Sequence, residues 1–224
     1  LAALHWICFY GSIKASNVSV ALICFSSVGF FTSLTEPLLE KKPIKLQELL
    51  LGALVMAGIS IMFHFDARYK TGILLGIASA VFMAFVMVLL RKHLRQHNSE
   101  TVLTWQLSGG FITLSLFMPF YLSYAPAPIW PGWSNLGWLL ILAWVCSVWA
   151  FTLTGNALRH LSAYTVNLSF NLEPLYGIIM AFLLFGENNE VNAAFYIGAT
   201  LIMLSVVIHS WIYYRNSKKQ QTNL

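Results

Sequence analysis

One acidic residue lies inside a long apolar stretch of the chain, and its type and position make it the first candidate for chemistry. Glu173 stands near the middle of the run 162–185, which contains no other Asp, Glu, Lys or Arg. An acidic side chain at the centre of a membrane helix costs about 2.5 to 3.5 kcal/mol on insertion scales, so the fold has to compensate it. Pro174 follows directly and removes a helical hydrogen bond at the same depth, as in discontinuous membrane helices that expose carbonyls to a cavity. The carboxyl is therefore a candidate proton carrier or a partner for a cationic or zwitterionic ligand.

Further polar residues flank Glu173 on the same predicted helix. At 100° per residue they fall on two faces, one with Ser162, Thr165, Ser169 and Tyr176 and the other with Tyr164, Asn167 and Asn171. Two polar faces cannot both meet lipid, which favours a helix that lines a cavity. The alternative is a packing kink at Pro174 that is held by hydrogen bonds to neighbouring helices.

Polar and aromatic residues on two other predicted spans provide further candidates for a cavity wall. They are Trp144, Trp149 and Asn156 on the preceding span and His5, Trp6 and Tyr10 near the start of the chain. For each aromatic residue the alternative is ordinary packing or lipid contact, and for His5 it is a hydrogen-bonded buried histidine. The predicted substrate or coupling residues are Glu173, Asn171, Asn167, Ser169, Asn156, Trp149, His5 and Tyr10.

A histidine pair has the spacing of a metal site. His93 and His97 are four residues apart, which would place two imidazoles on one helix face. Basic residues surround the pair, however, and neither a third clustered histidine nor the acidic residue of a zinc-protease motif accompanies it. We therefore predict a solvated loop, no metal and no cofactor, and the pair remains the best support for an enzyme.

Small residues recur every four positions in one apolar run. Gly72, Gly76, Ala80 and Ala84 form this stripe, and Ala194 and Gly198 repeat it more briefly. Such stripes let helix backbones approach closely. Close packing between helices of the chain is the favoured interpretation, with a homodimer face as the alternative.

The composition indicates which elements must position these residues. Hydrophobic residues make up 58% of the 224 residues and charged residues only 9%, whereas about 25% is usual in soluble domains. The three cysteines lie inside apolar runs and are expected to behave as small hydrophobes. Because a spanning helix needs about 20 apolar residues, the apolar runs predict an all-α polytopic membrane protein with seven full spans and part of an eighth. The runs lie at about 1–13, 15–35, 46–64, 71–90, 101–124, 135–158, 162–185 and 192–214.

Basic residues predict the orientation of these spans. If the loop that contains Lys41 is cytoplasmic, successive loops lie on alternate sides of the membrane. Ten of the 13 basic residues then fall on the cytoplasmic side, and only Lys14, Arg68 and Lys70 fall on the opposite side, together with the acidic loop at Glu187. This asymmetry follows the positive-inside rule, so the basic tail 215–224 is expected to be cytoplasmic. It also argues against nucleic acid as the reason for the net charge of +5.

The chain contains a weak internal repeat. A shift of 145 residues aligns 12–18 with 157–163, and each copy has a helix end, a basic residue (Lys14 or Arg159) and the opening of the next helix. The same shift pairs Phe25 with Phe170, and two extra residues pair Glu40 with Glu187. Because the shift covers five spans, an odd number, the two copies must be inverted in the membrane. We predict that 1–64 is the remainder of a first repeat, with three spans of which the first is clipped, and that 71–214 is a second repeat of five spans.

These features resemble EamA-type permeases of the drug/metabolite transporter superfamily. The residues that carry the resemblance are 12–21, 157–163, Leu172-Glu173-Pro174 and Leu183-Leu184-Phe185-Gly186-Glu187. Glu36-Pro37 departs from the pattern, because it lies near a helix end of the first half instead of the matched mid-helix position. The resemblance implies ten helices in two inverted halves, of which the first two helices precede residue 1. It also implies export of small metabolites or drugs, and a bacterial inner membrane.

The favoured hypothesis is a secondary transporter that exports or exchanges a small molecule by alternating access, with a proton or another ion as the candidate coupling partner. Glu173-Pro174 and the inverted repeat favour this hypothesis. The alternatives are an intramembrane metal-dependent enzyme and a structural membrane subunit that transports nothing.

Overall fold

The computed structural model describes residues 1–41, 43–44, 46–65, 69–94, 96–124, 130–153, 173–189 and 191–222. All regular elements in these ranges are helices, which confirms the predicted all-α polytopic membrane class. Five helical stretches of the described residues are long and apolar enough to cross a membrane, namely Val18–Glu40, Lys70–Leu94, Ser99–Ser123, Trp133–Leu153 and Ala193–Ile212. The chain forms two compact units, one from Leu1–Val88 and Leu168–Leu224 and the other from Leu89–Asn167.

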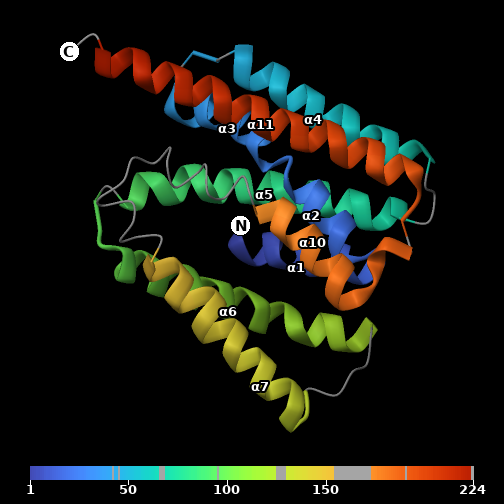
Figure 1. Ribbon diagram of the computed structural model, residues 1–224. Helices are drawn as coiled ribbons and strands as arrows, with labels where there is room; N and C mark the ends of the chain where they lie inside the picture. The colour runs from blue at the N-terminus through green and yellow to red at the C-terminus, as the bar shows by residue number, and fades with distance from the viewer. Residues whose placement is uncertain are drawn as a thin grey trace. The chain divides into compact units, whose positions relative to one another are not determined.

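The first unit combines helices from both ends of the sequence (Figure 1). Its elements are α1 (Ala2–Ala15), α2 (Val18–Phe25), α3 (Val28–Glu40), α4 (Leu46–Phe65), α5 (Lys70–Leu94) as far as Val88, α10 (Glu173–Phe185), the 3₁₀ turn η3 (Glu187–Asn189) and α11 (Ala193–Thr222). The two predicted repeats therefore do not coincide with the two units, because helices of both repeats pack in the first one.

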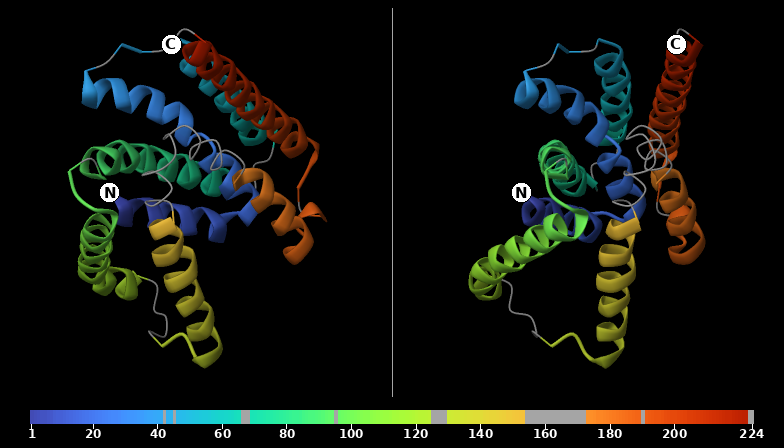
Figure 2. Two further views of the ribbon diagram at one scale, coloured as in Figure 1. Left: turned by 60° about the vertical axis from the view of Figure 1, so that its left-hand side comes forward. Right: turned by 90° about the vertical axis from the view of Figure 1, so that its left-hand side faces the viewer.

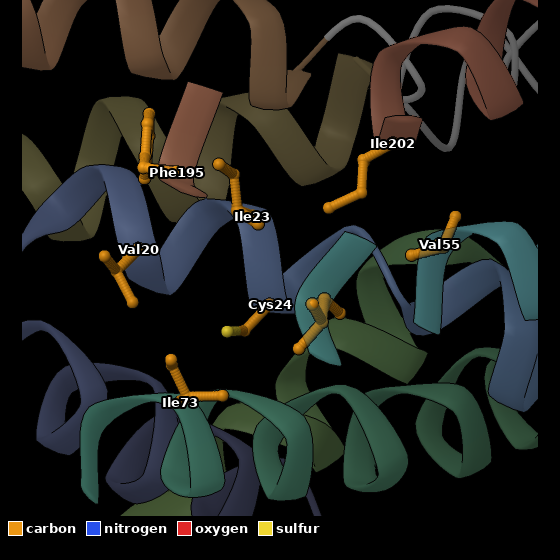
Figure 3. Close-up of a cluster of buried hydrophobic side chains, with 8 residues drawn as sticks. Val20, Ile23, Cys24, Val55, Ile73, Phe195 and Ile202 are labelled. Atoms are coloured by element: carbon orange, nitrogen blue, oxygen red, sulfur yellow. The ribbon is translucent and has the colours of Figure 1, made fainter. Parts of the chain in front are cut away.

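Helix α2 lies at the core of this unit. All its residues from Ser19 to Cys24 are buried, as expected of a short helix that is apolar all round. Val20, Ile23 and Cys24 of α2 join side chains of α4, α5 and α11 in one cluster (Figure 3). The other members of the cluster are Val55, Ile59, Ile73, Phe195 and Ile202.

The predicted span 15–35 differs from the observed one in two ways. It is interrupted at Ser26 and Ser27, which separate α2 from α3. The Ser26 hydroxyl donates to the Ile23 carbonyl and the Ser27 hydroxyl to the Cys24 carbonyl, each at 2.6 Å. The same two carbonyls also accept the Ser26 and Ser27 amides, at 3.2 and 3.1 Å, so both serine hydroxyls find an acceptor within the turn, as an apolar environment requires. Beyond the break, α3 continues past Thr35 to Glu40 with Pro37 inside it, and the left-handed residue Lys41 (φ 52°) ends it.

The glycine and alanine stripe of α5 packs inside the first unit. The Ser12 hydroxyl of α1 donates to the Gly72 carbonyl at 2.7 Å. A Cβ atom at Gly76 would lie 2.6 Å from Cβ of Cys24, so only glycine permits this approach of α2. Ala80 is fully buried on the same stripe. The stripe therefore brings α5 against both α1 and α2.

Helices α4 and α11 lie side by side and antiparallel (Figures 1 and 2). The Ser205 hydroxyl donates to the Leu51 carbonyl at 2.7 Å. Two turns further along α4, a Cβ atom at Gly58 would lie only 2.8 Å from the carbonyl oxygen of Gly198. The shorter stripe, Ala194 and Gly198, therefore lies at this helix contact.

The second unit contains α6 (Ser99–Tyr124), α7 (Trp133–Ile141) and the π-helix η2 (Leu142–Trp149), which continues α7. Asn98 caps α6 by accepting from the Thr101 amide at 2.9 Å. In η2, which is long for a π-helix, the Ser147 hydroxyl donates to the Leu142 carbonyl five residues earlier. The side chains of α7 and η2 are largely exposed, so this unit offers apolar surface to its surroundings.

Candidate functional site

Four of the eight predicted substrate or coupling residues lie in the part of the chain that the structure describes. These are His5, Tyr10, Trp149 and Glu173, whereas Asn156, Asn167, Ser169 and Asn171 lie outside the described residues. Trp149 belongs to the second unit, where it stands at the end of η2 with an exposed side chain. Among the four, only His5, Tyr10 and Glu173 share a unit.

His5 is a buried histidine with polar and aromatic neighbours. Its Nδ1 atom lies 2.9 Å from the Ser79 hydroxyl and 3.2 Å from the Ser79 carbonyl on α5. Its ring packs against Phe9 and Phe25, with centroid distances of 5.9 and 5.4 Å. Nδ1 accepts a hydrogen bond from the hydroxyl in one tautomer and donates one to the carbonyl in the other. These contacts match the alternative interpretation of His5, a hydrogen-bonded histidine that joins α1 to α5.

Tyr10 and Glu173 occupy different environments from His5. Tyr10 is half exposed on α1, and its position five residues after His5 turns it about 140° around the helix. Glu173 lies in the first turn of α10 and its side chain is exposed, a place where a negative charge is favourable beside the helix N-terminus. Pro174 follows within the same turn. His5 and Tyr10 therefore lie on different faces of α1.

Glu187 is the polar residue that the sequence interpretation missed. The sequence places it in an exposed acidic loop, yet its side chain is only 5% exposed, while Asn188 and Asn189 beside it are exposed. Its Oε1 accepts from the Val18 amide and its Oε2 from the Ser19 amide, both at 2.8 Å. Hydrogen bonds to a charged group stabilise by about 1.5 to 3 kcal/mol each. We call this arrangement, the Glu187 carboxylate with the Val18 and Ser19 amides, the Glu187 clamp.

The clamp completes the N-terminus of α2. The first amides of a helix have no acceptor within the helix, and in α2 side chains supply three of these acceptors. Asn17 Oδ1 accepts from the Val20 amide at 2.9 Å, and Glu187 serves Val18 and Ser19. The positive end of the helix dipole also favours the carboxylate. Gly186, in the left-handed region at φ 68°, ends α10 immediately before Glu187. A glycine that ends a helix and is followed directly by a glutamate is the sequence pattern that could have indicated Glu187 as a candidate.

The contacts of the first unit place a defined set of helix ends together. The Glu187 clamp joins the end of α10 to the start of α2. The bonds from His5 to Ser79 and from Ser12 to Gly72 make α1 and α5 antiparallel. Hence the end of α1, the starts of α2 and α5, and the end of α10 lie at one end of this unit (Figure 1). This is the end at which the charge pattern places Lys14, Lys70 and Glu187.

The histidine pair takes no part in these contacts. His93 lies in the last turn of α5, and its Nδ1 atom is 2.7 Å from the carbonyl of Leu89 on the same helix. Among the described residues, no group of three or more His, Cys, Asp or Glu side chains is arranged to hold a metal ion.

Comparison with models of known protein families shows to which family the chain belongs. The model of the EamA-like transporter family matches residues 70–211, well over half of the chain, and this range includes both Glu173 and Glu187. The comparisons with curated proteins and with solved structures give no match. The resemblance seen in the sequence is confirmed by the family model. The chain is an integral membrane protein that belongs to the EamA-like transporter family.

Proposed function

We propose that this protein is a secondary transporter that exports or exchanges a small metabolite or drug-like molecule across the cytoplasmic membrane by alternating access. The observation that carries the proposal is the family match over residues 70–211. The inverted repeat expected from the sequence supports it, since this architecture is common among secondary transporters and places their site near the membrane midplane.

Glu173 is the coupling or substrate-binding group in this proposal. Its carboxyl can carry a proton or pair with the cationic group of a substrate, and an ionisable residue inside a predicted span is by default a candidate for such a role because its burial in lipid is costly. The neighbouring Asn167, Ser169 and Asn171, and Asn156 on the preceding predicted span, are the proposed amide and hydroxyl partners of the substrate. Trp149, His5 and Tyr10 remain candidates for the polar and aromatic wall of the proposed substrate cavity.

The proposed orientation gives a direct prediction. A reporter fused after Leu224 should be cytoplasmic, and one inserted at Asn189 should lie outside the cell, because ten of the 13 basic residues fall on the side of the tail. Paired alkaline phosphatase and green fluorescent protein fusions in bacterial cells measure the two sides. Both reporters on one side would contradict the orientation and the inverted repeat together.

The transport activity itself can be tested before the substrate is identified. Cells that produce the protein and cells that carry the empty vector are compared by mass spectrometry of the medium and of the cell extract. We expect at least one small metabolite to accumulate outside and to fall inside. If no metabolite is redistributed while the protein is present in the membrane, as measured by blotting of membrane fractions, the export proposal is wrong under these growth conditions. A proteoliposome exchange assay with radiolabelled amino acids and amines then decides whether exchange also fails.

A further inference from the structure

We propose that the Glu187 clamp is a positioning device that holds α2 in the core of the first unit, and that the negative charge of Glu187 maintains the closed state of the end where α2 begins. The inference rests on the transport function proposed above, because only a transporter needs such an end to open and close. It assigns a role to a residue that is not among the predicted substrate or coupling residues.

The first argument is the geometry of the carboxylate. Each oxygen accepts one backbone amide at 2.8 Å, and the two amides belong to consecutive residues, Val18 and Ser19. Glu187 thus binds the first turn of α2 with two parallel hydrogen bonds across a separation of 168 residues. Such a two-point contact fixes both the position and the orientation of the helix end.

The second argument is the requirement for charge. Both partners are N–H donors at the positive end of a helix dipole. A glutamine in place of Glu187 would keep the shape but would offer one oxygen acceptor, and its NH₂ group would face the second donor. The clamp therefore needs two acceptors and a negative charge, which only a carboxylate provides.

The third argument is the direction of the Glu187 side chain. Asn188 and Asn189 in the same turn are exposed, whereas Glu187 is buried. Gly186 at φ 68° sets this turn, in a conformation that residues with a Cβ atom rarely adopt. A charged residue of a connecting turn is normally solvated. The local backbone instead directs Glu187 towards α2.

The fourth argument concerns what α2 keeps buried. The helix has only eight residues, so its own hydrogen bonds cannot hold it in place. Leu22 packs against Gly177 of α10, and Cys24 packs against Gly76 of α5. Cys24 has no exposed surface. A shift of α2 would expose this thiol, which makes Cys24 a native probe of the closed state.

The experiment measures the rate at which N-ethylmaleimide modifies Cys24. Cys8→Ala and Cys146→Ala leave Cys24 as the only thiol of the chain. In the purified full chain we expect slow modification with Glu187 and an increase of about tenfold or more in Glu187→Gln, because charged hydrogen bonds to α2 are lost. Asn189→Ala, an exposed residue of the same turn, is the matched control and should leave the rate unchanged.

A second measurement separates the clamp from general unfolding. Hydrogen–deuterium exchange of the peptide around residues 16–25 should speed up in Glu187→Gln while peptides of α4 and α11 keep their protection. In Glu187→Ala, added formate should restore slow exchange, since it supplies the missing carboxylate. An unchanged Cys24 rate in Glu187→Gln, or a loss of protection throughout the chain that formate does not reverse, overturns the inference. If Glu187→Gln speeds the modification of Cys24 but the wild-type protein redistributes no metabolite, the positioning role of Glu187 is supported and the transport proposal is rejected.

Discussion

Glu173→Gln is expected to reduce export to less than about a tenth of the wild-type rate, or to uncouple it from the proton gradient, while the protein still reaches the membrane. Both proposed roles of Glu173, proton carrier and partner of a cationic substrate, need the negative charge that the amide lacks. A packing kink would be set mainly by Pro174 and would tolerate the amide. The measurement is the external-to-internal ratio of the identified substrate, recorded at several pH values.

The matched control for this variant is Glu36→Gln, because Glu36 also precedes a proline, Pro37, but lies towards the end of α3. Export should persist in the control. Normal export by Glu173→Gln, with the pH dependence of the wild type, would assign Glu173 to helix packing and would remove the only coupling group proposed within a span.

The second large effect is expected at the contact of α4 with α11. Gly58→Leu should lower the stability of the protein by about 3 kcal/mol, because its Cβ atom would lie 2.8 Å from the Gly198 backbone oxygen and the two helices would have to separate. For a chain of this size that loss corresponds to a fall of roughly 6 to 12 °C in Tm. Thermal denaturation in detergent, followed by fluorescence-detected size exclusion, measures it.

Gly29→Leu is the appropriate comparison, since it makes the same change on α3 and a Cβ atom at Gly29 meets nothing within 4 Å. Its Tm should stay within a few degrees of the wild type. Equal losses in the two variants would show that the leucine, and not the contact of Gly58 with Gly198, causes the destabilisation.

The helical class and the approximate positions of the spans could be predicted because long apolar runs have few stable structures other than helices in a membrane. The break between α2 and α3 could not. Serines are common in membrane helices, and only the backbone shows that α2 stops here, because the Ser26 and Ser27 amides donate to the carbonyls of Ile23 and Cys24, three residues earlier. The charge-free run ends at residue 35, before Glu36, yet α3 continues to Glu40. The apolar runs therefore identified the five membrane-length helical stretches of the described residues, but not the interruption at Ser26 and Ser27.

The site was predictable to a lesser degree, because pattern arguments treat each helix alone. Glu173 stood out since its charge contradicts the apolar run around it. Glu187 did not, because a charge between two helices is expected in water, and its burial depends on the α2 amides 168 residues earlier. His5 illustrates the same limit, since its partner Ser79 lies on a helix 74 residues later in the chain. Asn156, Asn167, Ser169 and Asn171 lie outside the described residues and stay predictions.

The long separation between α2 and Glu187 has a consequence for how the protein is made. At a synthesis rate of about 5 to 20 residues per second, the 168 residues between Ser19 and Glu187 take roughly 10 to 30 seconds to translate. During that time α2 has already left the ribosome, but its first amides have no carboxylate to bind. Insertion of the early helices and completion of their core are therefore separate events, and a nascent chain arrested before Glu187 should expose α2 to chaperones and membrane proteases.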